Sequence, residues 1–151
     1  MKLNYQWPFP SQPRPIAIIG SGGIVKDAHL PAYQKAEFKV LGVYDINPEQ
    51  SAKIANSWNL KAFGSLDSLI SSAQSQNAVF DLALPPSAVS NVLEQLPEHA
   101  TVLIQKPMGS DFEEAKLIKA ICERKKLTAA VNFQLRFSPM MLALKLSHIH
   151  I

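Results

Sequence analysis

The chain has 151 residues, of which 47% are hydrophobic and 18% charged, and it carries a formal net charge of +3. This length supports one domain with a full core, and the composition is that of an ordinary globular protein. The basic residues are scattered apart from Arg124-Lys125-Lys126, which ends a predicted helix, where cations favour the helix dipole. The charge pattern therefore argues against nucleic acid as a partner.

Residues 1–14 form the first predicted segment, a Pro-rich extended arm. Pro8, Pro10 and Pro13 exclude a helix there, because proline has no backbone N–H to donate. The arm lacks the positive region and apolar core of a signal peptide, and no apolar run in the sequence is long enough to span a bilayer. Cys122 is the single cysteine, so no disulfide can form within the chain, and we expect it to be a buried bystander. We therefore expect a cytoplasmic protein without a membrane partner.

From residue 15 to 137, short apolar runs alternate with amphipathic segments. Strands are predicted over residues 15–19, 38–44, 61–63, 79–84, 101–105 and 127–133. Helices are predicted over residues 24–35, 48–58, 65–73, 87–96, 111–126 and from 138 onward. Asn47 and Asp111 are the expected N-cap residues of two of them. The alternation predicts an α/β fold, a doubly wound parallel sheet with helices on both faces.

The first strand is followed by a glycine-rich turn, Gly20-Ser21-Gly22-Gly23, and then by a helical segment that begins at Ile24. A strand, a glycine turn and a helix N-terminus in this order can cradle a pyrophosphate with backbone N–H groups. Glycines after a strand also form ordinary turns, so this pattern alone leaves both interpretations open.

Asp45 ends the second predicted strand, about 20 residues beyond the glycine turn, where a dinucleotide-binding unit places the acid that binds the adenosine ribose. A negative charge there would repel a 2′-phosphate, so the pattern favours NAD over NADP. The alternative is that Asp45 caps the helix beginning near Pro48, and one residue could do both.

Taken in order, these segments resemble the glucose-fructose oxidoreductase / inositol dehydrogenase (Gfo/Idh/MocA) family, from about Arg14 to Lys145. Besides the glycine turn and Asp45, the resemblance is carried by His29-Leu30-Pro31-Ala32, Leu84-Pro85-Pro86, Gln105-Lys106-Pro107 and Asn132 to Phe137.

The resemblance implies a Rossmann domain that binds NAD and a catalytic lysine, Lys106, between nicotinamide and substrate. A lysine there can exchange a proton with a substrate hydroxyl and stabilise a developing alkoxide. Asn132, Gln134 and Arg136 alternate after the last strand and are expected on one side, near the nicotinamide. The cofactor-binding residues implied are Gly20, Ser21, Gly22, Gly23, Ile24, Asp45, Leu84, Pro85, Pro86, Gln105, Lys106, Asn132 and Gln134. No metal site is predicted.

Three positions depart from the family pattern. Val25 stands where a glycine or alanine is usual, so we expect the following helix to sit slightly outward. Gln105 replaces a glutamate, which removes a negative charge beside Lys106. Val89 replaces a histidine that often follows the Pro-Pro turn. For His29 we expect a structural role, in capping or packing, rather than catalysis.

In the resembled family, the chain continues into a second α+β domain that supplies much of the substrate pocket. Residues 138–151 are predicted to start a helix leading toward that domain, and we expect the domain itself to be missing here. We expect the NAD-binding domain of an oxidoreductase acting on a polyol, sugar or related hydroxy compound, weakly active or inactive alone. Its C-terminal segment is expected to mediate self-association. Two alternatives stay open: a stand-alone NAD-binding sensor or interaction module, and a non-functional truncated remnant.

Overall fold

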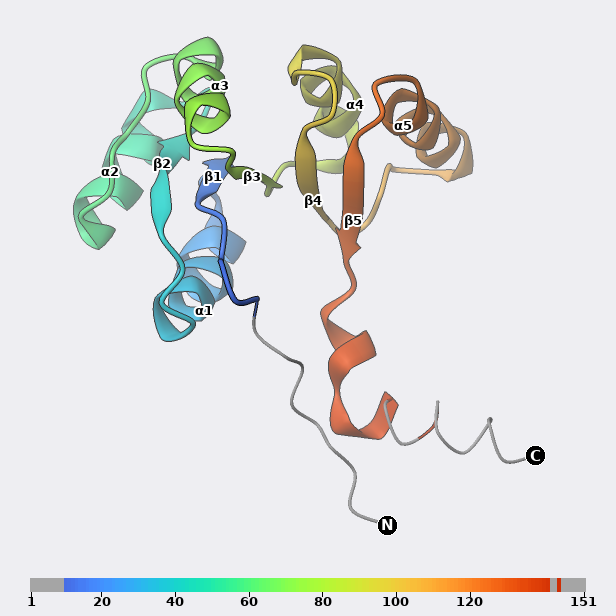
Figure 1. Cartoon of the computed structure of the whole chain (residues 1–151), viewed down its shortest axis with the longest axis horizontal. Helices are drawn as coiled ribbons and strands as arrows, with labels where there is room; N and C mark the ends of the chain where they lie inside the picture. Colours follow the sequence, from blue (N-terminus) through green and yellow to red (C-terminus); the bar gives the residue numbers. More distant parts are fainter. Residues whose placement is uncertain (1–9, 142–143, 145–151) are drawn as a thin grey trace.

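Five parallel strands form the centre of the molecule in the order β2-β1-β3-β4-β5 (Figure 1). The computed structural model describes residues 10–141 and 144. The strands are β1 (Ile16–Ile19), β2 (Val40–Tyr44), β3 (Val79–Leu82), β4 (Thr101–Gln105) and β5 (Thr128–Asn132). This arrangement confirms the predicted α/β fold with a doubly wound parallel sheet.

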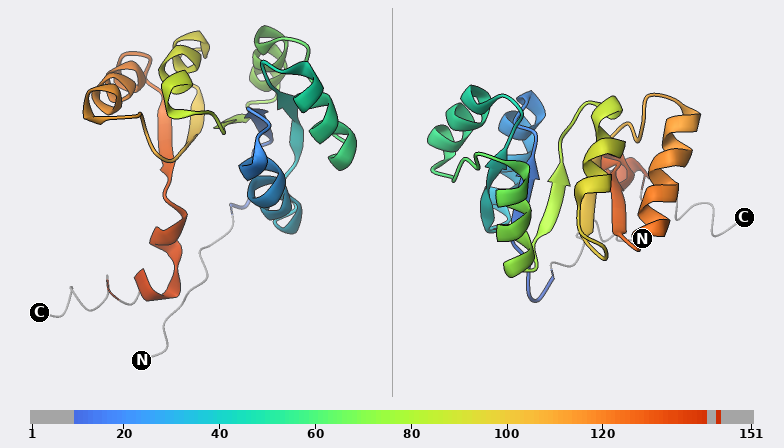
Figure 2. Two further views of the ribbon diagram at one scale, coloured as in Figure 1. Left: turned by 180° about the vertical axis from the view of Figure 1, so that it is seen from behind. Right: turned by 90° about the horizontal axis from the view of Figure 1, so that it is seen from above.

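Helices cover the sheet from both sides. They are η1 (Val25–His29), α1 (Leu30–Lys35), α2 (Pro48–Trp58), α3 (Leu66–Ser75), α4 (Pro86–Gln95), α5 (Phe112–Arg124) and the 3₁₀ helix η2 (Gln134–Phe137). One core cluster joins α1 and α2 to Ile18 and Val43 on one face. The other joins α3, α4 and α5 to the opposite face, and these three helices lie together in Figures 1 and 2. The side chains of β1 therefore alternate between two apolar layers, with Ile16 and Ile18 in one and Ala17 and Ile19 in the other.

The α1 face of the sheet stays open near β4 and β5. Ala129 and Ala130 of β5 are exposed, and a groove of about 430 Å³ runs past Leu103 and Ala130. The described end of the N-terminal arm borders this groove with Pro10 and Pro13. Parallel sheets usually have both faces covered, so this region is unusually accessible.

Two helix starts follow the sequence prediction. The side chain of Asn47 accepts hydrogen bonds from the backbone N–H groups of Glu49 (3.1 Å) and Gln50 (3.3 Å) at the start of α2. Asp111 accepts from the Glu114 N–H at 2.8 Å at the start of α5. These side chains satisfy N–H groups that a helix leaves unpaired at its first turn.

Several predicted bounds differ from the structure by one or two residues, as for the strand predicted over 79–84, which ends at Leu82. Two predicted segments also differ in kind. Residues 61–63 form only an isolated bridge, in which Val43 donates to Lys61 and accepts from Phe63. The helix predicted over 24–35 begins with a π-helical turn, because Pro31 has no N–H to continue the α-helical ladder. The strand predicted to reach residue 133 ends at Asn132. Most of the predicted segment 138–151 lies outside the described residues.

Candidate functional site

Gly20 directly follows β1, in a conformation that only glycine adopts easily. Its φ is +95°, and a Cβ there would lie 2.3 Å from the backbone oxygen of Ala83. Gly20 therefore allows β1 and the segment after β3 to approach closely at the start of the glycine loop (Gly20–Gly23).

Gly22 has no such neighbour. No heavy atom lies within 4 Å of the position that a Cβ would occupy, so packing within the described chain does not require a glycine here. Its carbonyl accepts from the N–H groups of Val25 (3.1 Å) and Lys26 (3.3 Å), which places Gly22 at the start of the first helical turn. The loop thus offers an open backbone at a helix N-terminus, a geometry that fits a pyrophosphate.

Ser21 is fully buried and is held from two sides. The Oδ2 atom of Asp45 accepts from the Ser21 N–H at 2.7 Å and from its hydroxyl at 2.8 Å. The side-chain amide of Gln50 donates to the Ser21 carbonyl at 2.9 Å. The loops after β1 and β2 are therefore tied together through Ser21.

Asp45 is partly exposed beside this loop. Its Oδ1 atom accepts from the Asn47 N–H at 2.9 Å, and the N-cap of α2 is Asn47, so the alternative prediction of Asp45 as that cap is wrong. An ionised carboxylate has about four acceptor sites, and the protein uses three of them. Asp45 retains the capacity to accept from a further hydroxyl.

Leu84, Pro85 and Pro86 lie next to the glycine loop. A Cβ on Gly20 would contact a methyl carbon of Leu84 at 3.2 Å. Pro85 is the N-cap residue of α4 and Pro86 its first residue. The loops after β1 and β3 therefore meet at the same edge of the sheet, as expected at the carboxyl ends of parallel strands.

Lys106 follows β4 and is exposed. It lines a cavity of about 480 Å³ together with Phe133, Gln134 and Leu135. Gln105 is buried, and its side-chain oxygen accepts from the Lys106 N–H at 3.0 Å. Gln105 is thus turned back onto the backbone that carries Lys106.

Ile24, Asn132 and Gln134 line a second cavity, of about 280 Å³. Gln134 borders both cavities, which brings the end of β5 close to both Lys106 and the start of helix η1. The predicted alternation of Asn132, Gln134 and Arg136 is wrong beyond Asn132, because residues 134–137 form a 3₁₀ helix with a period of three. Arg136 is not among the residues that line either cavity.

A buried polar cluster beneath the second cavity was missed in the sequence. Asp81 of β3 is completely buried, and its Oδ2 atom lies 2.7 Å from Nδ1 of His29 and 2.9 Å from the Tyr33 hydroxyl. Burial raises the pKa of Tyr33 well above its usual range, and the charge of Asp81 raises it further. His29 is buried and pairs with Asp81, and its side chain makes no capping bond. An aspartate inside an apolar strand is the signal that could have revealed this cluster.

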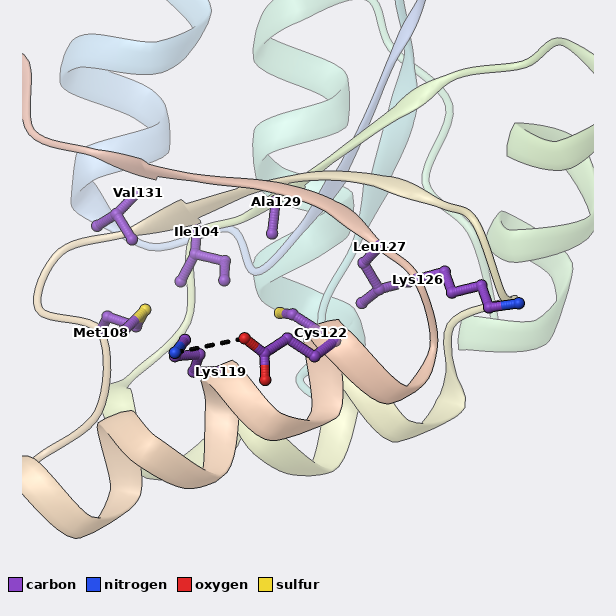
Figure 3. A pocket seen from close by; sticks show the side chains of 9 residues that line it. Ile104, Met108, Lys119, Cys122, Lys126, Leu127, Ala129 and Val131 are labelled. Carbon is purple, nitrogen blue, oxygen red and sulfur yellow. Dashed lines mark ion pairs between the residues drawn. The ribbon is translucent and has the colours of Figure 1, made fainter.

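A third cavity, of about 370 Å³, lies between α5 and β5 on the other face of the sheet (Figure 3). Met108, Cys122 and Val131 line it, and Lys119 pairs with Glu123 at its rim at 3.3 Å. Burial raises the pKa of the Cys122 thiol, which is half-buried as a packing residue. This cavity contains no residue of the glycine loop.

Neither a metal site nor a membrane-spanning helix occurs in the part of the chain that the structure describes. Within residues 10–141 and 144, no three histidine, cysteine or acidic side chains are grouped so that they could hold a metal ion. In the same part of the chain, no helix has the length and apolar character needed to cross a membrane.

Comparison with known proteins agrees with this geometry. The family model for Gfo/Idh/MocA proteins, described as an oxidoreductase family with an NAD-binding Rossmann fold, matches residues 14–133. The chain is 32% identical over 131 residues to the putative oxidoreductase YceM of Salmonella typhimurium, covering 86% of this chain and 42% of that protein. It is 31% identical over 125 residues to glucose-6-phosphate 3-dehydrogenase of Bacillus subtilis, covering 81% and 34%. The chain thus spans well under half the length of these relatives.

Solved structures show the same fold. The UDP-N-acetylglucosamine 3-dehydrogenase of Acidithiobacillus ferrooxidans superposes with a TM-score of 0.72 at 25% identity, covering 88% of this chain and 42% of that one. The WlbA dehydrogenase of Bordetella pertussis, solved with NADH and UDP-GlcNAcA, gives a TM-score of 0.72 at 21% identity, covering 92% and 42%. The second likeness supports the fold alone.

Proposed function

Because the chain belongs to the Gfo/Idh/MocA oxidoreductase family with its NAD-binding Rossmann fold, we propose that it binds NAD(H) as the cofactor domain of a dehydrogenase. The proposed substrates are sugars, polyols or related hydroxy compounds. The dehydrogenases of Bacillus subtilis and Acidithiobacillus ferrooxidans named above support this substrate class, since their names specify phosphorylated or nucleotide-linked sugars.

The open backbone at Gly22 is the observation that carries this proposal. Gly22 lies at the first turn of a helix, and no heavy atom is within 4 Å of the position that its Cβ would occupy. Because no protein atom fills this space, it is open to a ligand. Gly22 and Gly23 would receive the pyrophosphate, and Asp45 the adenosine ribose. Ile24, Asn132 and Gln134 would border the nicotinamide. Leu84, Pro85 and Pro86 would line the side of the cofactor that carries the adenine and the pyrophosphate.

Lys106 is the proposed catalytic residue. When bound, the nicotinamide cofactor supplies the carbon that accepts or returns a hydride. Lys106, exposed in the cavity with Gln134, would hydrogen-bond the substrate oxygen at Nζ. Its neutral amine would take up the hydroxyl proton when the substrate is oxidised, and its ammonium would return a proton to the oxygen when the substrate is reduced. Phe133 and Leu135 would form the apolar part of the cavity beside this oxygen.

The proposed binding of NAD(H) at the glycine loop can be tested by calorimetric titration with NADH. The wild-type chain should bind NADH, and Gly22→Val should abolish binding, because a branched side chain would occupy the path of the pyrophosphate. Gly64→Val is the matched control, since Gly64 also has nothing within 4 Å of its Cβ position but lies outside the glycine loop. Circular dichroism checks that both variants fold. Normal binding by folded Gly22→Val would show that the loop is only a turn.

A second candidate is a module that binds NAD(H) without turnover. The exposure of Lys106 favours it, because catalysis depends on orientation and on exclusion of water, and the described residues enclose this lysine on few sides. A turnover assay on polyols and sugars separates the two candidates. We propose weak or absent turnover by this chain alone.

A further inference from the structure

Gln50 contacts the glycine loop from a different element of the fold. It lies in the first turn of α2, and its side-chain amide donates to the Ser21 carbonyl at 2.9 Å. We infer that Gln50 is a positioning residue, which orients the Ser21–Gly22 peptide toward the pyrophosphate. This inference rests on the proposed function.

Peptide geometry connects this bond to the ligand. In a planar trans peptide, the carbonyl and the following N–H point in opposite directions. Because the Ser21 carbonyl points at Gln50, the Gly22 N–H points away from α2. No hydrogen bond within the described chain uses this N–H, and the Cβ position of Gly22 is open. The free donor and the open space belong to the same residue.

The rest of Ser21 is fixed independently. Asp45 accepts from both its N–H and its hydroxyl, so Gln50 controls the one polar group of Ser21 that Asp45 does not hold. Ser21 is fully buried, and a carbonyl that loses its partner there is costly to leave unpaired. Without Gln50, the peptide between Ser21 and the flexible Gly22 would populate other orientations, and the ligand would have to select one of them.

The test compares Gln50→Leu, which keeps the size of the side chain but cannot donate, with the wild type. Calorimetry should show NADH and NADPH each binding about 3- to 10-fold more weakly, the equivalent of one hydrogen bond. Their affinity ratio should stay unchanged, because both cofactors carry the same pyrophosphate. Gln95→Leu is the matched control, since Gln95 also donates to a backbone carbonyl, that of Asn91, but far along α4.

Gln50→Glu provides a second readout. Its ionised carboxylate cannot donate to the Ser21 carbonyl, whereas the protonated form can. The NADH affinity of this variant should therefore recover relative to the wild type as the pH falls toward about 5, nearer the usual pKa of glutamate. This variant also keeps the inference testable if Gln50→Leu does not fold.

The outcomes separate the inference from the proposed function. If the wild type binds neither NADH nor ADP-ribose, the proposed function fails. If it binds both, but Gln50→Leu and Gln95→Leu bind alike, the role of Gln50 is wrong. A changed NADH/NADPH ratio in Gln50→Leu would also overturn the inference, because it would make Gln50 a ribose contact instead.

Discussion

Asp45 combines two tasks that the sequence suggested only in part. It anchors the buried Ser21 and keeps acceptor capacity at the edge where the proposed ribose would lie. We predict that the chain binds NADH more tightly than NADPH, because a carboxylate repels a 2′-phosphate. Asp45→Ala should reduce the difference in binding free energy between NADH and NADPH by about 1–3 kcal/mol, the cost of losing hydrogen bonds to a charged group.

Calorimetric titration of both cofactors measures this preference. The ratio of the two affinities is the informative quantity, since Asp45→Ala also releases Ser21 and should weaken both complexes. The Gln50→Leu variant is the control, because it loosens the same loop without removing the charge. Equal or tighter binding of NADPH by the wild type would contradict the assignment of Asp45.

At the scale of elements, the contact between α1 and β3 depends on the buried cluster of Tyr33, His29 and Asp81. The folded domain keeps the Tyr33 phenol neutral, since burial and Asp81 raise its pKa. In the unfolded chain this phenol ionises near its ordinary pKa of about 10. Stability should therefore be full below about pH 10 and fall as the pH rises further, because the unfolded state then releases a proton that the folded state retains.

Urea unfolding between about pH 8 and pH 11 tests this dependence. Tyr33→Phe cannot ionise and should show a shallower loss of unfolding free energy over that range than the wild type. Tyr44→Phe is the matched control, because it removes the same hydroxyl from a tyrosine of β2, outside the cluster of Tyr33, His29 and Asp81. Parallel curves for the wild type and Tyr33→Phe would mean that the Tyr33–Asp81 contact does not govern alkaline stability.

The elements themselves were largely predictable, because apolar periodicity and capping residues such as Asn47 and Asp111 act locally. The features that the sequence did not predict depend on contacts between residues that are far apart in the chain. Whether residues 61–63 pair as a strand depends on β2, and the π-turn depends on how Pro31 interrupts a helix already docked on the sheet. The glycine loop and Asp45 were found by their spacing, whereas Gln50 was missed because its bond to Ser21 joins residues 29 apart and no local pattern marks it.

At the scale of the whole molecule, apolar side chains gather on the surface beyond β5. Phe133 is 53% exposed, Leu135 75% and Met140 70%. Phe133 and Leu135 belong to the C-terminal segment that the sequence analysis expects to mediate self-association, whereas the side chain of Phe137 and all of Leu142 lie outside the described part. Large exposed apolar groups close together commonly mark an interaction site. Phe133 and Leu135 line the cavity together with Lys106, so a partner bound there would also enclose the proposed catalytic residue.

We therefore predict that the chain self-associates through this surface. Sedimentation velocity at several protein concentrations should show a concentration-dependent increase in mass, because burial of these side chains contributes roughly 25 cal/mol per Å². The double variant Leu135→Ser, Met140→Ser should shift the equilibrium toward monomer. Ile46→Ser is the matched control, since Ile46 is 89% exposed but follows β2 at the opposite edge of the sheet. A wild type that stays monomeric at all concentrations would contradict the prediction, and an equal effect of Ile46→Ser would place the interface elsewhere.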